Sequence, residues 1–361
     1  MAADLPNSVK QLSDSGAFSS LPLQLYASRD PTAPSDVDAT LEPQIPTIDL
    51  SLLTGATPRE RARMVQRLGR ACQDWGFFMA RTFRVVVNHG VPEGLRQAML
   101  EAAKKFFDLE EEDKEELRGE TVLDPIRYGT SFNPKAEVGV RYWRDFLKLA
   151  VHPDFHSPAK PLCFSDVLRD YATCTRRVGM ELLKGIWESL DLEENDMNKA
   201  LKLDSCFQVF VANLYPPCPQ PELVFGLPPH SDLGLLTLLH QNGVDGLDVE
   251  HGGKWVHVKP LPGSFLVNAG DHMQIVTNGR YKSTLHRAMA NGKSTRVSVL
   301  TVVGPSLDTV VEPVAALVSS ERPAMYRGWS YRQFLECHQG NQLKEKAVLE
   351  LLRCRDHEDV I

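Results

Sequence analysis

Apolar and polar residues alternate in several short stretches between residues 207 and 305, with Gly, Pro and Asn between the stretches. A period of two is typical of β-strands that bury one face. The stretches LDVEH and KWVHV flank Gly252 and Gly253, which predicts a hairpin. SFLVNAG predicts another strand, which ends in a turn at Gly270 and leads into a further strand or a short helix. The pattern therefore predicts a strand-rich core in this part of the chain.

The segments before this core show the helical period and its start signals. Thr57, Pro58 and Glu60 have the spacing of a capping box with proline at the first helical position. The same period predicts a helix through residues 95–106, a long helix over 165–190 and a short helix in DLEENDMNKAL. The helix that begins at Pro58 presents an apolar face made of Met64, Leu68, Cys72 and Trp75.

Other stretches predict strands that lie outside the 207–305 segment. IPTIDL has the alternation and β-branched content of a strand, and WGFFMARTFRVVVNHG is apolar enough for another. YGTSFNP (128–134) and YWRDFLKLAV (142–151) are expected to cross toward the core. After the core, helical patterns recur at 330–337 and 343–353.

These elements divide the chain into four segments. Residues 1–43 are a loosely ordered lead-in, rich in Ser, Pro, Asp and Ala, with one short helix. Residues 44–204 form a helix-rich region, residues 205–305 the strand-rich core and residues 306–361 a helical tail. We predict a mixed α/β fold with a mainly β core and helices around both ends of it.

Composition narrows the class of protein. Of its 361 residues 42% are hydrophobic and 24% charged, as in ordinary globular proteins. The net charge of −7 argues against nucleic acid or an anionic membrane surface as the main partner. There is no apolar run of the roughly 18 residues that a membrane helix needs, no signal-peptide order at the N-terminus, and no C-x-x-C pair among the scattered cysteines. We expect a cytoplasmic monomer whose partner is a small-molecule substrate, with no membrane and no nucleic acid partner.

Candidate metal ligands lie inside the strand-rich core. His230 and Asp232 stand one residue apart in PPHSDLG, and His286 follows much later in STLHRA. Two imidazoles and one carboxylate make the facial triad of a non-haem Fe(II) oxygenase, which leaves coordination positions open. Residues i and i+2 of a strand point to the same side, so His230 and Asp232 can face one metal. A closed antiparallel barrel or a double-sheet jelly roll can bring His286 to them.

The short H-x-D motif is a weak signal by itself, because a histidine in apolar surroundings is often a packed side chain. Order and local sequence together favour the triad over the other histidines of the same stretch, which are His240, His251, His257 and His272.

A series of longer motifs follows the chain in order: IPTIDL, WGFF with NHGVP, FFDLEEEDK, YGTSF, NLYPPCPQPEL, PPHSDLGLLTLL, GLDVEHGGKWVHVKPLPGSFLVNAGD, NGRYKSTLHRA and R-V-S. From about Ile45 to Leu335 the chain thereby resembles the plant-type iron(II)- and 2-oxoglutarate-dependent dioxygenases, the superfamily of flavonoid, gibberellin and alkaloid hydroxylases. The resemblance implies a double-stranded β-helix (jelly-roll) core and assigns His230, Asp232 and His286 to Fe(II) as the catalytic centre. It also implies 2-oxoglutarate as co-substrate, O2, and ascorbate as an activator.

The resemblance assigns further residues to 2-oxoglutarate. Arg296 and Ser298, in TRVSV, would bind its distal carboxylate, and Asn213 and Tyr215, in NLY, would contact the same co-substrate. A guanidinium fork meets a carboxylate through two hydrogen bonds, where lysine offers only a point charge. The implied reaction oxidatively decarboxylates 2-oxoglutarate to succinate and CO2 while a small specialised metabolite is hydroxylated, desaturated or demethylated.

The substrate side is less well defined by the sequence. Tyr128, Phe132 and Trp143 are candidates for the substrate wall. The pocket has to be apolar to protect the oxidant, and suitable linings, for which plain core packing is an equal alternative, are Leu235, Leu238, Val267 and Leu285.

The chain departs from the family pattern at two places. MARTFRVVV separates WGFF from NHG, and the extra residues within Met79–Val85 are expected to form a bulge or surface loop, because a strand cannot absorb them in register. Val211 stands where flavonoid-oxidising members often have Lys, and Val302, Gly304 and Pro305 replace part of their F-x-E-P motif. This second departure weakens a flavonoid assignment.

Two other functions remain open at this point. One is an oxidase of the same fold that uses iron and ascorbate without 2-oxoglutarate. The other is a jelly-roll ligand-binding protein whose catalysis is impaired by the insertion near Met79, although the complete ligand set argues against it. A zinc hydrolase would leave Arg296 and Ser298 unexplained.

Overall fold

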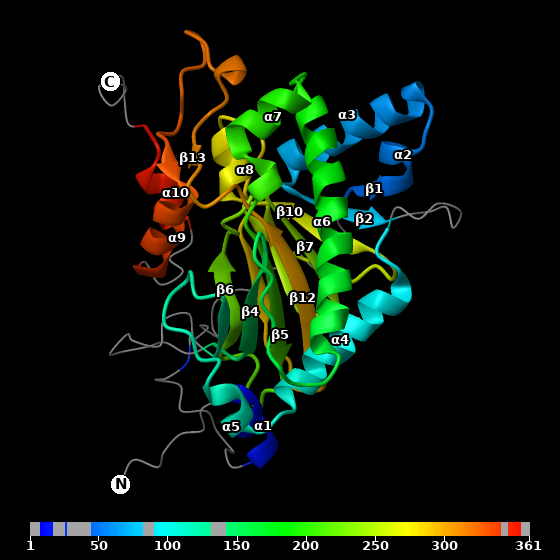
Figure 1. The fold of residues 1–361 in the computed structure, drawn as a ribbon, viewed down its shortest axis with the longest axis vertical. Coiled ribbons are helices and arrows are strands. Elements are labelled where there is room, and N and C mark those ends of the chain that lie inside the picture. Colours follow the sequence, from blue (N-terminus) through cyan, green and yellow to red (C-terminus); the bar gives the residue numbers. More distant parts are fainter. Residues whose placement is uncertain are drawn as a thin grey trace.

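The structure is a computed structural model that describes residues 8–16, 26, 45–81, 90–130, 142–340 and 346–354. Its centre is a pair of β-sheets, one with eight strands and one with four. Helices lie along one face of the larger sheet and at both ends of the pair (Figure 1). The predicted mixed α/β fold with a jelly-roll core and flanking helices is confirmed.

The larger sheet combines strands from distant parts of the chain. Only β1 and β2 pair in parallel, and the other neighbouring strands pair antiparallel. In order across the sheet the strands are β1 (Thr47–Asp49), β2 (Phe77–Arg81), β10 (Phe265–Ala269), β7 (Leu236–Gln241), β12 (Arg296–Val303), β5 (Gln208–Tyr215), β4 (Asp145–His152) and β3 (Ile126–Gly129).

The smaller sheet supplies the opposite wall of the core. Its order is β6 (Phe225–His230), β11 (His286–Met289), β8 (Leu247–His251) and β9 (Lys254–His257). The last two form the predicted hairpin, whose turn contains Gly252 and Gly253, both with positive φ. A separate pair of short strands, β13 (Val310–Val311) and β14 (Trp329–Ser330), lies outside both sheets.

Helices occur where the apolar period predicts them. The capping box of Thr57 and Glu60 is formed at the start of α3. The segment after Gly270 is a short helix, α8, so the second of the two alternatives is correct. Among the described helices, none combines the length and apolar character that crossing a membrane requires. The helices are α1 (Val9–Ser15), α2 (Leu50–Thr54), α3 (Pro58–Asp74), α4 (Glu93–Phe107), α5 (Glu111–Glu115), α6 (Phe164–Glu188), α7 (Glu194–Leu201), α8 (Asp271–Val276), α9 (Tyr331–Gly340) and α10 (Ala347–Leu351), with 3-10 turns at Leu203–Ser205 and Ala315–Leu317.

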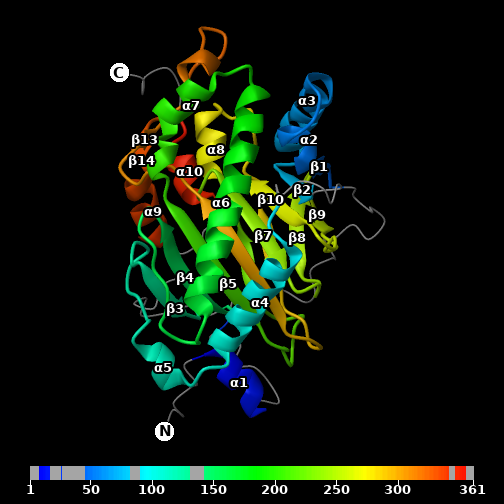
Figure 2. The same ribbon diagram turned by 45° about the vertical axis from the view of Figure 1, so that its right-hand side comes forward.

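The long helix α6, together with α4, covers the outer face of the larger sheet (Figure 2). Gly179 allows this close packing, since a Cβ there would lie 3.2 Å from Cγ2 of Val303 on β12. The layer between helices and sheet is the main hydrophobic core, and burying such side chains stabilises the fold by roughly 1.5–3 kcal/mol each.

Alternation along the strands decides which residues face the helices and which face the interior between the sheets. On β5, Phe210, Ala212 and Leu214 belong to the core under the helices. Asn213 and Tyr215 alternate with them along the strand and line the cavity on the other face. A strand that looks uniformly apolar therefore serves two different surfaces.

The strand-rich core is not confined to residues 205–305. Strand β4 pairs with β5 along nearly its whole length, and β2 pairs with β10. Both partners come from the 44–204 segment, so the larger sheet crosses that boundary. Helix α9 of the 306–361 segment also reaches the cavity, through Tyr331 and Leu335.

The predicted bulge within Met79–Val85 is wrong for its first three residues. Met79, Ala80 and Arg81 pair in regular register with β1, and Met79 and Ala80 also pair with β10. They remain in the ladder because Met79 and Ala80 are buried apolar residues that the sheet accepts. The remaining residues, 82–85, lie outside the described part of the chain.

Candidate active site

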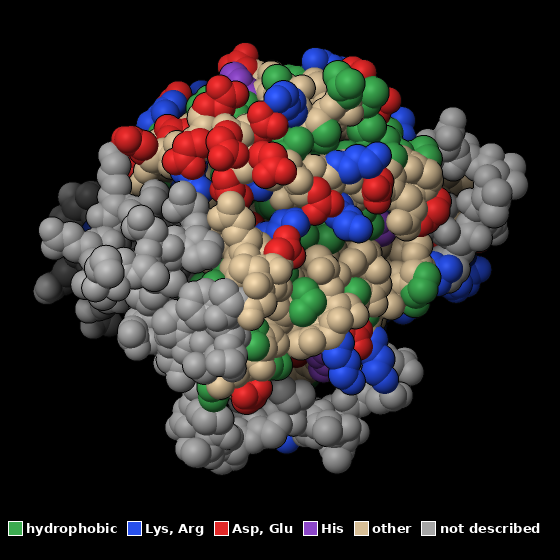
Figure 3. All heavy atoms as spheres, turned by 90° about the horizontal axis from the view of Figure 1, so that it is seen from below, with side chains coloured by type: hydrophobic (Ala, Val, Ile, Leu, Met, Phe, Trp, Pro, Cys, Tyr) green, Lys and Arg blue, Asp and Glu red, His purple; other side chains and the backbone are tan. Residues whose placement is uncertain are grey.

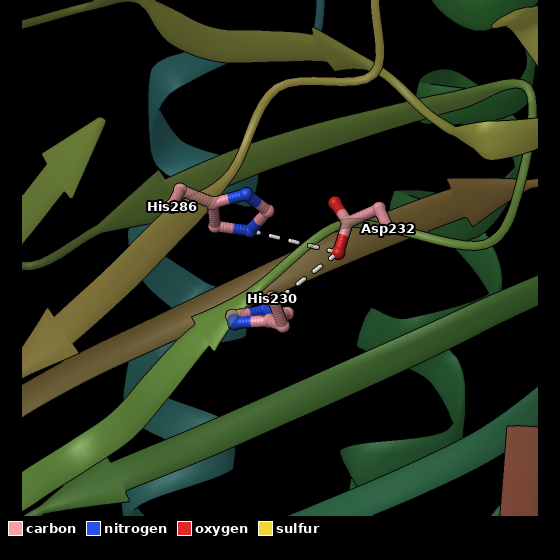
Figure 4. A group of neighbouring side chains, drawn as sticks. All are labelled: His230, Asp232 and His286. Carbon is pink, nitrogen blue, oxygen red and sulfur yellow. Dashed lines mark ion pairs between the residues drawn. The ribbon is translucent and has the colours of Figure 1, made fainter. Parts of the chain in front are cut away.

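The three predicted metal ligands come together between the two sheets. His230 ends β6, and His286 begins β11 directly opposite it in the ladder. Asp232 Oδ1 lies 3.6 Å from Nε2 of His286 and 3.9 Å from Nε2 of His230 (Figure 4). One ligand atom from each residue can be chosen so that all lie within 4.8 Å of one another, a separation suited to one metal ion.

Asp232 reaches this site by a route that strand geometry alone does not give. It lies beyond the end of β6, so the expectation that His230 and Asp232 share a strand face is wrong in detail. The loop is held by two backbone hydrogen bonds: the amide of Asp271 donates to the Asp232 carbonyl oxygen at 2.7 Å, and that of Gly270 to the Leu235 carbonyl oxygen at 3.1 Å. The side chain is fixed by Asn268, whose Nδ2 donates to Oδ2 at 2.7 Å.

The imidazoles are oriented by backbone carbonyls behind them. Nδ1 of His230 lies 2.8 Å from the carbonyl oxygen of Pro228, and Nδ1 of His286 lies 3.3 Å from that of Thr284. When Nδ1 carries the proton and donates it there, the lone pair of Nε2 points at the shared position. This is the arrangement that a metal-binding histidine needs.

The charge state of the cluster also suits a cation. Burial, with a contribution from His286, lowers the pKa of His230 to about 3. Burial acts to raise the pKa of Asp232, but His286, His230 and Asn268 outweigh it, and the pKa stays below its ordinary value. A neutral imidazole at His230 and an ionised carboxylate are the forms that bind divalent metals.

Arg296 and Ser298 lie in the same cavity, on the interior face of β12. The guanidinium of Arg296 is 1% exposed, donates through Nε and Nη2 to Oε1 of Gln241, and has Cζ 5.0 Å from the ring centroid of Tyr215. Within the described residues no carboxylate pairs with it, and the buried Oγ of Ser298 has no hydrogen-bond partner. A buried cation beside an orphaned hydroxyl is a fitting receptor for a carboxylate.

Asn213 is also on the cavity face, but its side chain is engaged. Its Oδ1 accepts a hydrogen bond of 3.0 Å from Nη1 of Arg144. Asn213 stands opposite Ser298 in the β5–β12 ladder, so it connects the Arg296 end of the cavity to Arg144.

Two of the three predicted substrate-wall residues do not line the cavity. Tyr128 faces the helices, where its ring packs against Phe106, and the cavity-facing residue of β3 is its neighbour Arg127. Trp143 is buried against Tyr26, and its Nε1 donates to the carbonyl oxygen of Pro216 at 2.9 Å. Both predictions are wrong, and Phe132 lies outside the described residues.

The predicted apolar lining is also wrong, and on β7 the residues in the cavity are the sequence neighbours of the predicted ones. Leu235, Leu238 and Val267 belong to the core under the helices, as the alternative interpretation allowed, and Leu285 is not part of the cavity wall. On β7 the interior face carries Thr237 and Leu239 instead. The cavity of about 200 Å³ is lined by residues that include Arg127, Arg144, Phe146, Lys148, Val209, Leu227, Leu247, Ala288, Leu300, Tyr331, Leu335 and His338.

Sequence reasoning missed the cationic side chains of this wall and the contribution of α9. Alternation along YWRDFLKLAV places Phe146 and Lys148 on one face, so that signal was available. No local signal places His338 in the same cavity as Asp232, because its position depends on how the tail folds back. A larger hollow of about 490 Å³, between α4 and the loop 258–264, contains none of the triad.

The four other histidines of the segment have separate roles. His251 stacks on Trp75, and Nδ1 of His257 lies 3.0 Å from Oδ1 of Asp248. His240 packs against Phe265, and His272 is buried with Nδ1 2.6 Å from the carbonyl oxygen of Leu233. None of them joins the triad, as the sequence predicts.

Gly270 provides a test of how tightly the Asp232 loop is held. A Cβ at this position would overlap the carbonyl oxygen of Gly234 and lie 2.9 Å from that of Asp232. We expect Gly270→Ala to destabilise the protein by about 1–3 kcal/mol and to weaken iron binding, because the loop has to shift. Gly94→Ala in α4 is the matched control, since nothing lies within 4 Å of its Cβ. Thermal unfolding and iron content measure both effects; equal behaviour of the two variants would contradict the account.

The chain is similar to known proteins along most of its length. Residues 206–305 match the family model of the 2OG-Fe(II) oxygenase superfamily, and residues 45–168 match the model described as non-haem dioxygenase in morphine synthesis N-terminal. A protein of Oryza sativa subsp. japonica, 2-oxoglutarate-dependent dioxygenase 19, is 47% identical over 92% of this chain and 96% of its own length. Flavanone 3-dioxygenase 2 of the same organism is 37% identical over 86% and 88%.

A solved structure is similar along almost the entire chain. The crystal structure of JOX2 in complex with 2OG, Fe and JA has a TM-score of 0.83 and 29% sequence identity, covering 98% of this chain and 99% of that one.

Proposed function

The chain belongs to the superfamily of 2-oxoglutarate- and iron(II)-dependent oxygenases, and on this basis we propose that His230, Asp232 and His286 hold its iron. It is a 2-oxoglutarate-dependent dioxygenase, an oxidoreductase that oxidises a small specialised metabolite with release of succinate and CO2. The convergence of the three ligand atoms within 4.8 Å supports the assignment. When bound, the iron supplies, together with 2-oxoglutarate and O2, the oxidant that removes hydrogen from the substrate.

Arg296 and Ser298 bind the distal carboxylate of 2-oxoglutarate in this proposal. The observation that supports it is that a buried guanidinium and a buried hydroxyl lie in the cavity of the triad, and that among the described residues the first has no carboxylate partner and the second no hydrogen-bond partner. Tyr215 lies beside the guanidinium and is positioned to add a hydroxyl contact. Asn213 contributes indirectly, because its side-chain oxygen accepts a hydrogen bond from Arg144.

The remaining residues shape the reaction. Asn268 holds the Asp232 carboxylate in place, and the carbonyls of Pro228 and Thr284 keep the histidine Nδ1 protons away from the metal position. Apolar side chains such as Leu227 and Ala288 limit water near that position. Protection from water keeps the oxidant directed at the substrate.

Several broader properties are proposed with this function. Ascorbate acts as an activator, and the protein works as a cytoplasmic monomer without a nucleic acid partner. Acidic side chains gather in one area of the face in Figure 3, with basic ones scattered among them, which supports the last point. We retain the four segments 1–43, 44–204, 205–305 and 306–361 as a description of sequence, with one sheet shared between the second and third.

Succinate release distinguishes this function from the iron and ascorbate oxidase. The purified protein, supplied with Fe(II) and a panel of plant metabolites, is assayed once with 2-oxoglutarate and once with ascorbate alone. We expect iron-dependent succinate formation with 2-oxoglutarate and no product with ascorbate alone. Product formation without 2-oxoglutarate would favour the oxidase, and binding without turnover in either assay would favour the impaired ligand-binding protein.

A further inference from the structure

Three basic side chains form one wall of the cavity, from β3, from β4 and from the residue just before β4. They are Arg127, Arg144 and Lys148, here called the cationic wall. Arg127 and Lys148 stand directly opposite each other in the ladder of the two strands. Like charges in this position destabilise a sheet unless another group balances them.

The cationic wall lines the same cavity as the proposed iron site. Arg144 is hydrogen-bonded to Asn213, beside Ser298. Lys148, at the other end of the wall, lies near His338 of α9. Burial and Lys148 lower the pKa of His338 to about 4, so this histidine is neutral near pH 7 and adds no charge.

The protein does not neutralise two of these cations with its own described carboxylates. Elsewhere it pairs buried cations: Arg287 Nε lies 3.1 Å from Oδ2 of Asp248, and Lys114 Nζ lies 2.9 Å from Oε1 of Glu111. Arg144 is 8% exposed, and its buried Nε has no hydrogen-bond partner within the described residues.

Among the described residues Lys148 donates one hydrogen bond, and a neutral group accepts it. Its Nζ donates to the carbonyl oxygen of Val122 at 2.9 Å. Burial and Arg127 lower the pKa of Lys148 to about 7, while Asp124 only partly opposes them. Asp124 itself is engaged by Thr121. A ligand anion in the cavity would restore the charge of Lys148 and satisfy Arg144.

We propose that the substrate of this enzyme carries a carboxylate that binds the cationic wall through Arg144 and Lys148, with Arg127 adding charge. This inference rests on the proposed function, because Arg296 is then occupied by 2-oxoglutarate and a second anion has to use the second set of cations. The fork of Arg144 suits a planar carboxylate.

The rest of the substrate is apolar. Phe146 lies between the cations, with its ring centroid 5.2 Å from Cζ of Arg144 and 5.5 Å from Cζ of Arg127. Val209 and Leu335 continue the wall toward α9. A hydrophobic carboxylic acid therefore fits, with its carboxylate on the wall and its carbon skeleton extending toward the triad.

The test compares an acid with its neutral analogue while the co-substrate site is filled. The enzyme is loaded with Zn(II) and saturating 2-oxoglutarate, and binding of 4-(trifluoromethyl)phenylacetate and of the corresponding amide is followed by fluorine NMR. We expect the acid to bind at least about tenfold more tightly than the amide, as charge-assisted hydrogen bonds imply. Arg144→Gln and Lys148→Met should each weaken binding of the acid by a similar factor, and the double variant should lose the preference.

Controls separate this inference from folding and from the proposed function. Lys160→Met removes an exposed lysine and should change nothing, while Lys148→Arg keeps the charge and should keep the preference. Lys148→Met should melt no lower than the wild type, because it removes a charge that none of the described carboxylates pairs with. Equal binding of acid and amide, no binding of the acid, or an unchanged preference in the double variant would overturn the inference. Failure to bind 2-oxoglutarate in the wild type would instead contradict the proposed function.

Discussion

Replacement of Asp232 by alanine is expected to abolish both iron binding and succinate formation while the chain stays folded. The carboxylate is the only anionic member of the triad, so its loss leaves two imidazoles to hold a divalent cation. The affinity should fall by more than the roughly 10- to 100-fold that follows from altering a residue behind a ligand. His230→Ala and His286→Ala should have the same outcome. Iron content per chain and turnover measure the effect.

The fold should survive because it depends on apolar packing elsewhere. Asp232 lies in a loop beyond β6, and the backbone hydrogen bonds that hold this loop do not involve its side chain. His257→Ala and Asp245→Ala are matched controls from the same segment, since both residues are more exposed and paired with each other at 3.7 Å. We expect these controls to retain iron. Full iron content in any triad variant would remove that residue from the ligand set.

Arg296→Ala is expected to weaken 2-oxoglutarate binding by about a hundred- to a few thousand-fold. The guanidinium is 1% exposed, and removing it leaves a buried anion without its partner, a loss of roughly 3–5 kcal/mol. Iron affinity should barely change, because Arg296 is not a ligand. The apparent Michaelis constant for 2-oxoglutarate, measured beside iron content, gives the result.

Two further variants sharpen this prediction. Arg296→Lys should recover only part of the affinity, since a single ammonium cannot reproduce the fork. Ser298→Ala should weaken 2-oxoglutarate binding less, by about 1.5–3 kcal/mol, because only one hydrogen bond to a charged group is lost. An unchanged Michaelis constant in Arg296→Ala would mean that the distal carboxylate binds elsewhere, and the cationic wall would be the first place to look.

The sequence predicted the chemistry of the site better than its walls. His230, Asp232, His286, Arg296 and Ser298 were predicted because metal and carboxylate binding demand particular residue types in recognisable motifs. The fold confirms that these residues meet in one cavity. The roles proposed for them rest on chemistry that few other residue types can provide.

Predicted substrate-wall residues such as Tyr128 are displaced by one position from the residues that line the cavity, and the displacement has a physical reason. Side chains on a strand alternate between faces, so mistaking the face exchanges every residue for its neighbour. Tyr128 was expected in the cavity and Arg127 is there; Leu238 was expected and Leu239 is there. On a strand covered by helices on one side and a cavity on the other, hydrophobicity alone does not say which face is which.

Long-range contacts could not be predicted at all from local patterns. Helix α9 reaches the cavity through Tyr331, Leu335 and His338, although the tail has only an ordinary amphipathic pattern. The pairing of β4 with β5 likewise joins segments that sequence alone divides. Both depend on the topology of the whole chain, which the period of a single segment does not contain.

An anaerobic titration of 2-oxoglutarate into the protein tests the central claim most directly, because it asks whether iron and co-substrate share one site. The titration is made with and without Fe(II), for the wild type, Asp232→Ala and Arg296→Ala. We predict one tight 2-oxoglutarate site per iron in the wild type, much weaker binding without iron or in Asp232→Ala, and weakened binding with normal iron content in Arg296→Ala. Binding that is equally tight without iron, or unaffected by both substitutions, would contradict the account.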